Sequence, residues 1–216
     1  MQIADSPVLR PTNLTVEAWV RFNGLDSAGN AAPGEQYIVF KQNSRSGNFE
    51  GYFLGKVRGV GGDFFAFGVS SSAGQTAEVD STPLIQTGVW YHVAAVRGSN
   101  FIQLYVNGQL AGQTSVSFAQ DYGTLPLYFG TSGQSYWDRK FKGNLDEVSL
   151  YNRALSTSEI AAIYASGAGG TCKGSGVPSI AVQPQSQSVV VGNNAVITVT
   201  AAGAVPLSYQ WRFNGG

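Results

Sequence analysis

The sequence has little charge and no long apolar run. Only 12% of its 216 residues are charged, about half the globular average of roughly 25%. The 13 basic and 13 acidic side chains cancel, and no basic run is present that would neutralise the phosphates of a nucleic acid. No stretch approaches about 18 consecutive apolar residues, which a membrane-spanning helix requires. We therefore expect a surface of neutral polar groups, no nucleic-acid partner and no membrane span.

Cysteine and histidine occur once each. The single Cys172 excludes a disulfide within the chain, which leaves either an inert thiol in a linker or one half of a bridge to residues outside this sequence. His92 has neither a second histidine nor a nearby cysteine, so a zinc site is nearly excluded. We interpret His92 as a structural histidine, on the strand face that also carries Trp90 and Ala94.

Strand signals are abundant. Residues 14–22 alternate apolar and polar side chains, which is typical of a strand with two different faces. Asn107-Gly108 lies between two such runs and predicts a hairpin, because a type I′ turn needs positive φ at both central residues. The many short runs predict an all-β sandwich. The expected strands are 14–22, 36–41, 51–57, 64–70, 89–97, 101–106, 109–116, 125–130 and 144–151.

One short helix is expected near residue 160. Ser156 and Glu159 have the spacing of a capping box, and Gly167 supplies a C-terminal stop. We interpret this helix as a plug at one end of the sandwich. Its apolar stripe consists of Ile160, Ile163 and Tyr164.

A second domain is expected after a linker. Residues 169–178 are rich in Gly and Ser and end in Pro178, which is typical of a flexible domain boundary. The sequence therefore predicts a first domain at 1–168 and the start of another at 179–216. Its expected strands are 179–182, 188–191, 195–201 and 207–213.

The first domain resembles a known family. The order and spacing of five motifs are similar to those of laminin G-like, or concanavalin A-like, jelly-roll domains. The resemblance implies an antiparallel jelly-roll β-sandwich, with the family's usual first strand missing ahead of residue 2. The motifs are 15–20 (TVEAWV), 88–94 (GVWYHVA), 104–108 (LYVNG), 141–148 (FKGNLDEV) and 151–156 (YNRALS).

The second domain resembles the opening strands of an immunoglobulin-like domain. Residues 183–184 (QP), 191–192 (VG) and 206–211 (PLSYQW) carry the resemblance, with Trp211 as the core tryptophan of the third strand. The later strands are absent, so an incomplete immunoglobulin-like β-sandwich is expected. Either the sequence is a fragment, or another molecule completes the sheet.

The sequence offers one candidate pair of catalytic acids. Retaining jelly-roll glycosidases carry acidic residues at alternating positions of one strand, about 5 Å apart. Glu78 and Asp80 have this spacing, but Ser81 and Pro83 follow, so we interpret the segment as a loop or strand end and expect no catalysis. Trp19 and Trp90 lie within strands and are expected in the core.

Calcium is the expected ion, because the resemblance implies a site at a sandwich edge to which the Asp of a Gly-x-x-Asp-Glu-Val stretch contributes. That residue is Asp146, and calcium favours six to eight oxygen ligands. In the alternative, Asp146 accepts hydrogen bonds from backbone groups or pairs with Arg153.

The expected ligand site is the Gly/Ser-rich loop at 131–140. A loop tryptophan is costly to leave in water unless it packs or binds, and sugar rings stack on aromatic faces. The alternative is that Trp137 caps the core from one end. The loop contributes Tyr136, Trp137, Asp138 and Arg139, and other loops add Tyr122, Asn43, Arg45 and Asn48 to the rim.

These features predict a non-catalytic binding or adhesion module of a secreted or cell-surface protein, bacterial by resemblance. The expected partner is a carbohydrate, with an extracellular protein as the alternative. A second hypothesis is a structural subunit or spacer of an extracellular assembly, which self-associates through open sheet edges by strand exchange. A fragment of a glycoside-active enzyme comes third, because paired acids are missing.

Overall fold

The computed structural model describes residues 1–27, 34–82, 85–135, 138–167, 179–190, 192–194 and 196–202. Contacts divide the chain into two compact units, Met1–Ala165 and Ser166–Gly216.

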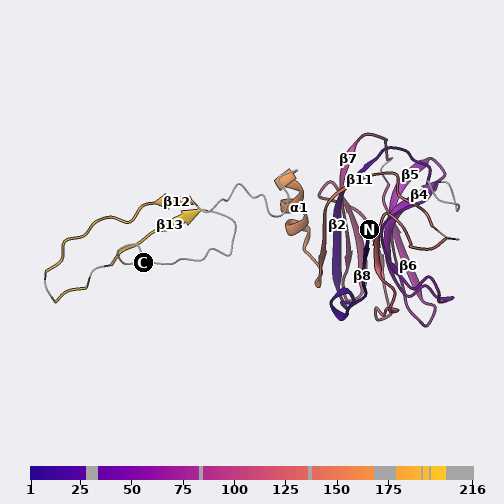
Figure 1. Ribbon diagram of the computed structural model, residues 1–216, viewed down its shortest axis with the longest axis horizontal. Coiled ribbons are helices and arrows are strands. Elements are labelled where there is room, and N and C mark those ends of the chain that lie inside the picture. Colours follow the sequence, from indigo (N-terminus) through magenta and orange to yellow (C-terminus); the bar gives the residue numbers. More distant parts are fainter. Residues whose placement is uncertain are drawn as a thin grey trace. The chain divides into compact units, whose positions relative to one another are not determined.

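The first unit is a sandwich of two antiparallel sheets (Figure 1), which confirms the all-β fold. A 3-10 turn, Pro7–Leu9, precedes the first long strand. The six-stranded sheet has the order β1 (Gln2–Ile3), β10 (Leu127–Phe129), β3 (Gln36–Gln42), β4 (Gly51–Gly59), β5 (Gly62–Ser70) and β6 (Thr76–Asp80). The five-stranded sheet has the order β11 (Gly143–Tyr151), β2 (Leu14–Phe22), β7 (Trp90–Arg97), β8 (Phe101–Val106) and β9 (Gln109–Ser115).

The core lies between the sheets and follows the alternation of the strands. On β2 the side chains of Leu14, Val16, Ala18, Val20 and Phe22 are at most 1% exposed and pack into one cluster with β3, β4 and β5. Burial of such a face is the main stabilising contribution to a sandwich.

The predicted hairpin turn is also present. Asn107 and Gly108 have φ values of 50° and 74° between β8 and β9, as a type I′ turn requires.

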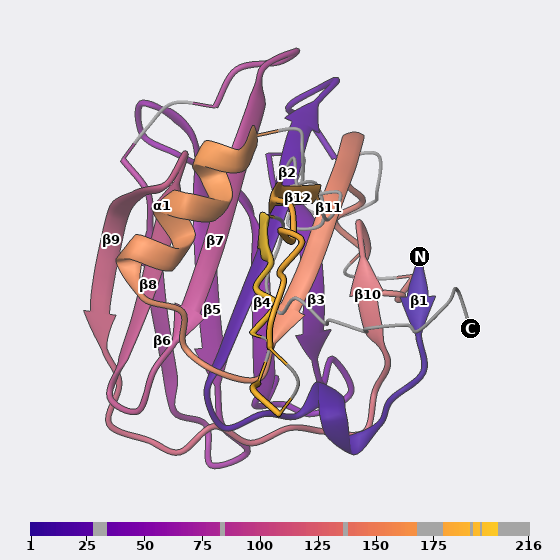
Figure 2. The same ribbon diagram turned by 90° about the vertical axis from the view of Figure 1, so that its left-hand side faces the viewer.

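Helix α1 (Thr157–Ser166) begins with the predicted capping box. The Ser156 backbone N–H donates to Glu159 Oε2 at 2.8 Å, and the Glu159 backbone N–H donates to Ser156 Oγ at 3.3 Å. Gly167 follows the helix with a φ of 62°. The predicted position was wrong, however. The helix packs against the outer face of the five-stranded sheet (Figure 2), where Ile160 joins Ala94 and other buried residues, and does not plug an end.

Two tryptophans and His92 lie outside the main core. His92 is buried beneath α1, where its Nε2 is 3.3 Å from Glu17 Oε2, and its ring packs against Trp19 and Tyr164. Trp90 was expected in the core but is 39% exposed, with the Arg21 guanidinium 5.4 Å from its ring centroid. The alternation places these side chains on the sheet face opposite the sandwich interior.

A buried cation ties β3 to the amino-terminal segment. The side chain of Lys41 is 1% exposed, and its Nζ donates to Asp5 Oδ1 at 2.7 Å and to the Leu125 carbonyl oxygen. Arg10 also pairs with Asp5. The hydrogen bond from Arg10, followed by that from Lys41, lowers the pKa of Asp5 to about 2 against the opposing effect of burial.

Acid should therefore remove a stabilising contribution of Asp5. Its pKa in the folded state lies below its ordinary value of 3.8, so the contribution is complete above about pH 4 and is lost as the pH falls towards 2. We expect Asp5→Asn to destabilise the protein at pH 7 and to reduce the slope of stability against pH between about 4 and 2. Urea unfolding at several pH values measures this. Parallel pH profiles of the variant and the parent protein would contradict it.

The second unit contains a short antiparallel pair, β12 (Ser179–Val182) and β13 (Thr200–Ala202). Residues 188–190, where another strand was predicted, are not in a strand. Cys172 and Trp211 lie outside the described residues, so the immunoglobulin-like domain stays a prediction, as do the boundaries at 168 and 179. Within the described part of the chain, no helix is long and apolar enough to cross a membrane.

Candidate functional site

The outward face of the six-stranded sheet carries a row of aromatic side chains. Residues directly opposite each other in an antiparallel pair share a face, so the register defines the row. Because Leu54 faces the core and Phe53 is its neighbour, this row faces outward. We call it the aromatic row; from β10 to β6 it runs Tyr128, Phe40, Phe53, Gly68 and Glu78.

A second row lies beside it and begins with Tyr37. The Tyr37 ring centroid is 4.5 Å from that of Phe40 and 5.9 Å from that of Phe53, so the three rings form one cluster. From β3 to β6 the second row runs Tyr37, Gly55, Ala66 and Asp80. The small residues in the middle of both rows, Gly55, Ala66 and Gly68, are buried.

Phe53 lies flat enough against the sheet to need glycine beneath it. A Cβ atom at Gly68 would lie 2.2 Å from Cε1 of the Phe53 ring and 2.9 Å from its Cδ1 and Cζ. Phe53 is partly exposed, whereas Phe40 and Tyr37 are buried. One edge of the cluster therefore contacts solvent, as an aromatic platform for a ligand must.

Charged groups surround the platform. The Arg139 guanidinium lies 5.4 Å from the Tyr37 ring centroid and pairs with Glu35. Burial raises the pKa of Tyr37, whereas Arg139 opposes the rise. Glu78 and Asp80 are exposed at the far end of the rows, on edge strand β6. Of the two alternatives for this segment, a loop or a strand end, the strand end is confirmed, because Thr76–Asp80 pairs with β5 and the strand ends at Asp80.

The two carboxyl groups on β6 retain protons more readily than isolated ones. Reduced hydration next to the sheet raises the pKa of Glu78, and the negative charge of Asp80 raises it further. Reduced hydration also raises the pKa of Asp80. Two such groups on one face supply hydrogen-bond acceptors for hydroxyl groups at one end of the platform.

The predicted ligand loop meets this platform through Arg139. Tyr37 N–H donates to the Arg139 carbonyl oxygen at 2.8 Å, which holds the loop against β3. Asp138 is buried and accepts hydrogen bonds from Thr131 Oγ1 at 2.6 Å and from the Ser132 N–H at 3.0 Å, so it organises its own loop. The remaining predicted loop residues, Tyr136 and Trp137, lie outside the described residues.

The other predicted rim residues lie beyond the opposite end of β3. Asn43 follows that strand and donates to Glu50 Oε1 at 2.5 Å, whereas Tyr37 stands at its start, about 20 Å away at 3.3 Å per residue. Tyr122 Oη donates to the Pro11 carbonyl oxygen at 2.7 Å. Asn43 and Tyr122 are therefore distant from Arg139. The single binding site predicted from the sequence is divided into two separate regions in the structure.

Arg45 and Asn48 follow Asn43 on the same loop and are exposed. The Asn48 side chain donates to the Ser72 carbonyl oxygen, which links this loop to the one after β5. Both residues therefore belong to the region of Asn43.

Asp146 lies on β11 and is exposed. Its Oδ1 accepts a hydrogen bond at 2.9 Å from the N–H of Glu147, whose φ is 50° at a bulge in the sheet. Arg153 pairs with Glu159 and not with Asp146. The described residues contain no group of three or more His, Cys, Asp or Glu side chains that could hold a metal ion. Calcium at Asp146 stays a prediction.

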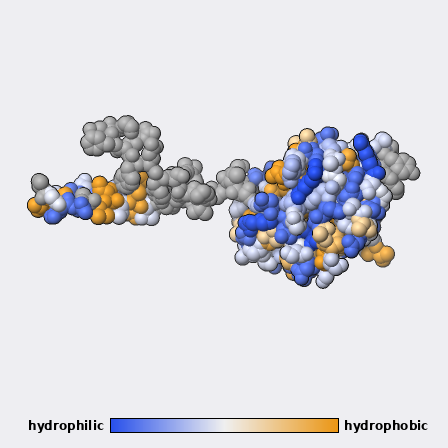
Figure 3. All heavy atoms as spheres, turned by 90° about the horizontal axis from the view of Figure 1, so that it is seen from below, coloured by the Kyte–Doolittle hydropathy of each residue, from blue (hydrophilic) through white to orange (hydrophobic). Residues whose placement is uncertain are grey.

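One face of the first unit is neither uniformly polar nor uniformly apolar (Figure 3). Figure 3 shows a face on which hydrophilic and hydrophobic residues are mixed, with small apolar patches between the polar ones. Small scattered apolar patches are ordinary on a protein surface.

Residues 1–161 match the family model described as the Concanavalin A-like lectin/glucanases superfamily. No curated protein sequence matches the chain. Many solved structures have a similar fold, among them the following three.

The first is the CBM40 of an IT-sialidase from Ruminococcus gnavus, bound to α2,3-sialyllactose, with a TM-score of 0.60 and 14% identity over 76% of this chain and 95% of that one. The second is domain 4 of an extracellular GH43 arabinanase from Geobacillus stearothermophilus, in complex with arabinotriose, with a TM-score of 0.55 and 21% identity over 74% and 70%. The third is an SAP-like pentraxin from Limulus polyphemus, with a TM-score of 0.55 and 16% identity over 76% and 72%. At these identities the likeness shows the fold alone.

Proposed function

Because the chain belongs to the Concanavalin A-like lectin/glucanases superfamily, we propose that its first unit is a non-catalytic carbohydrate-binding module. The observation that carries the proposal is the outward aromatic row, with Phe53 at its exposed edge and acidic side chains beside it. Two of the similar structures hold oligosaccharides, arabinotriose and sialyllactose, which supports the same class of ligand.

In this proposal each part of the face has a role. Phe53 provides an apolar surface on which a sugar ring stacks. Gly68 lets the aromatic ring of Phe53 lie close to the sheet. Glu78 and Asp80 accept hydrogen bonds from hydroxyl groups. Arg139 donates from the other side, held by its contacts with Tyr37 and Glu35. Apolar platforms with a few polar groups are the usual form of such sites.

The arrangement of the acids favours binding over hydrolysis. Glu78 and Asp80 have the alternating spacing on one strand that retaining glycosidases use, but a catalytic pair encloses the scissile bond between its carboxyl groups. These two side chains are instead exposed on an edge strand. We therefore propose no catalytic residue.

The remaining features of the proposed role rest on the sequence. We propose a secreted or cell-surface setting, with adhesion to a glycan or an extracellular protein, from the resemblance of both domains. Trp137 and Tyr136, two and three residues before Arg139, are proposed to extend the platform. A calcium ion at Asp146 belongs to the same proposal.

Phe53→Ala should weaken glycan binding at least tenfold, because a stacked aromatic supplies much of the contact with a sugar ring. The measurement is isothermal titration calorimetry of the full chain with soluble oligosaccharides that raise its melting temperature. A ligand that binds the folded state raises this midpoint by mass action.

Trp90→Ala is the matched control, because Trp90 is an exposed aromatic on the five-stranded sheet. It should leave the affinity unchanged. If Phe53→Ala binds the oligosaccharide as tightly as the parent protein does, the aromatic row is not the binding surface. The same conclusion follows if Phe53→Ala and Trp90→Ala lose equal affinity. No response to any oligosaccharide would remove the carbohydrate-binding proposal itself.

A further inference from the structure

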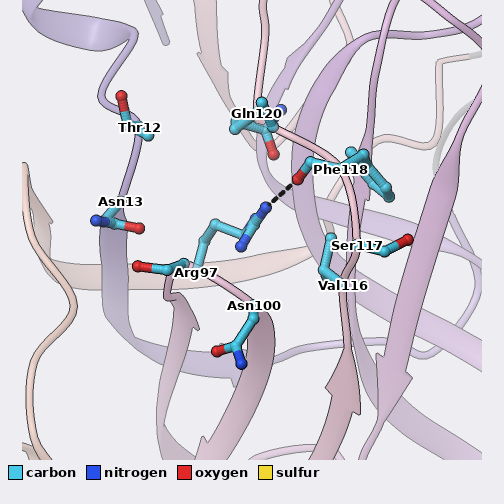
Figure 4. Close-up of a pocket in the computed structure, with 10 residues that line it drawn as sticks. Thr12, Asn13, Arg97, Asn100, Val116, Ser117, Phe118 and Gln120 are labelled. Carbon is cyan, nitrogen blue, oxygen red and sulfur yellow. Dashed lines mark hydrogen bonds between the residues drawn. The ribbon is translucent and has the colours of Figure 1, made fainter.

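A pocket of about 380 Å³ opens at the end of the sandwich where β7 ends and β8 begins. Figure 4 shows Arg97, the last residue of β7, between Thr12 and Asn13 on one side and segment 116–120 on the other. Ser99 and Asn100, from the turn after β7, complete the rim. This pocket is distinct from the aromatic row, which lies on the outward face of the other sheet.

Arg97 is a buried cation without a carboxylate. The residue is 2% exposed, and its guanidinium donates to the carbonyl oxygens of Gly98 and Phe118, the latter at 2.6 Å. Its Nε has no hydrogen-bond partner, and no described acidic residue forms an ion pair with it. Burial accordingly lowers the pKa of Arg97. Burial of a cation in this way costs free energy unless an anion pairs with it.

Two amide oxygens at the same pocket also lack donors. Asn13 Oδ1 and Gln120 Oε1 are buried and accept no hydrogen bond within the described protein. The orientation of the Gln120 amide is fixed, because its Nε2 donates to the carbonyl oxygens of Gly51, Ser70 and Asp121 at 2.9–3.2 Å. Gln120 therefore presents an acceptor and not a donor at this pocket.

A second pocket of about 320 Å³ adjoins the first, because Thr12 and Asn13 line both. Pro11 and Asn152 lie on its other sides. The hydrogen bond from Tyr122 Oη to the Pro11 carbonyl oxygen fixes this wall. Two adjoining pockets have room for two consecutive units of a chain molecule.

We propose that these pockets bind an acidic oligosaccharide, with the carboxylate of a uronic acid residue at Arg97 and the next sugar in the second pocket. A guanidinium favours carboxylates, and hydroxyl groups satisfy amide oxygens. A simple anion leaves the two amide oxygens without donors, and a neutral sugar leaves the cation without an anion. A uronic acid carries both groups. This site is independent of the aromatic row.

The test compares three ligands by calorimetry on the full chain. They are trigalacturonate, the same trisaccharide with its carboxyl groups reduced to alcohols, and inorganic phosphate. We expect trigalacturonate to bind at least tenfold more tightly than the reduced trisaccharide, and phosphate not to displace it at equal concentration. Equal affinity for both trisaccharides, no binding of trigalacturonate, or displacement by phosphate at equal concentration would overturn the proposal.

Variants locate the site. Arg97→Lys keeps the charge but lacks the planar guanidinium, and it should weaken trigalacturonate binding at least tenfold. Ser117→Trp fills the pocket from an exposed lining position and should do the same even if Arg97→Lys fails to fold. Phe53→Ala should leave trigalacturonate binding unchanged. Loss of that binding in Phe53→Ala, with retention in Ser117→Trp, would assign the acid to the aromatic row and overturn the proposal.

Discussion

Replacing Asp63 with alanine is expected to lower the free energy of unfolding by about 3–5 kcal/mol, because it leaves a buried cation unpaired. The side chain of Lys56 is fully buried, and its partner Asp63 is 7% exposed at the side chain. Lys56 Nζ donates to Asp63 and, at 2.6 Å, to the Gly34 carbonyl oxygen. Lys56 lies opposite Phe65 on the face that forms the core, so water does not replace the lost carboxylate.

The loss of stability in Asp63→Ala should become smaller at alkaline pH. Burial lowers the pKa of Lys56 below its ordinary value of 10.5, and Asp63 opposes this effect. Without Asp63 the pKa of Lys56 falls further, so the folded variant releases this proton before the unfolded chain does. Stability rises with pH wherever the unfolded state binds more protons. The variant should therefore regain stability relative to the parent protein as the pH rises towards 10.

Chemical unfolding from pH 7 to 10 measures both effects. Asp26→Ala is the control. Arg58 pairs with both Asp63 and Asp26 at this site, but the side chain of Asp26 is 67% exposed. Exposed ion pairs contribute about 0–1 kcal/mol, so this variant should change little. A comparable loss of stability in Asp63→Ala and Asp26→Ala would show that the buried pair contributes no more to stability than an exposed one.

Gly51→Ala is expected to cost about 3–5 kcal/mol, from a strained backbone together with a backbone clash. Gly51 begins β4 with a φ of 120°, a region that L side chains rarely adopt. A Cβ atom there would lie 2.0 Å from the Lys41 carbonyl oxygen on the neighbouring strand. Because that oxygen belongs to the sheet, neither side yields without separating β3 from β4.

Two control variants separate the two causes. Gly61 has a φ of 101° but open space around it, so Gly61→Ala tests the strain alone. Gly143 has no positive φ, yet a Cβ atom there would lie 2.0 Å from the Arg21 carbonyl oxygen, so Gly143→Ala tests the clash alone. Thermal or urea unfolding should rank Gly51→Ala as the most destabilised. A Gly51→Ala protein as stable as Gly61→Ala would exclude the close approach as a cause.

The local features of the fold were predictable from the sequence. The alternation over 14–22 predicted β2, and Asn107-Gly108 predicted the hairpin between β8 and β9. The spacing of Ser156 and Glu159 predicted the start of α1. Each of these signals acts between residues a few positions apart, so the sequence contains the whole of it.

Edge strands and strand ends were less predictable. The segment of Glu78 and Asp80 was interpreted as a loop or a strand end because Ser81 and Pro83 follow it closely. The pairing of β6 with β5, which depends on a partner elsewhere in the chain, decides between the two. Trp90 was placed in the core by its position in a strand, although the first residue of β7 lies at the margin of the sheet. Local propensity does not tell a central position from a marginal one.

The candidate sites depended on pairings that the sequence does not contain. Of the predicted ligand residues, Arg139 joins the platform of Tyr37 and Phe53, whereas Asn43 and Tyr122 lie beyond the other end of β3. The aromatic row was missed, because its three aromatic members come from three different strands, β10, β3 and β4, and face outward together only through the register. Arg97 gave no signal, since its burial without a carboxylate exists only in the folded chain.

The sequence by itself determined the class of fold, the family, the turns and the helix cap, because alternation, turn residues and capping pairs act over short distances. The tertiary structure alone decided which face of each sheet stays open, where α1 packs, and which side chains meet at Phe53 and at Arg97. Those outcomes depend on strand register and on burial, which bring together residues far apart in the chain.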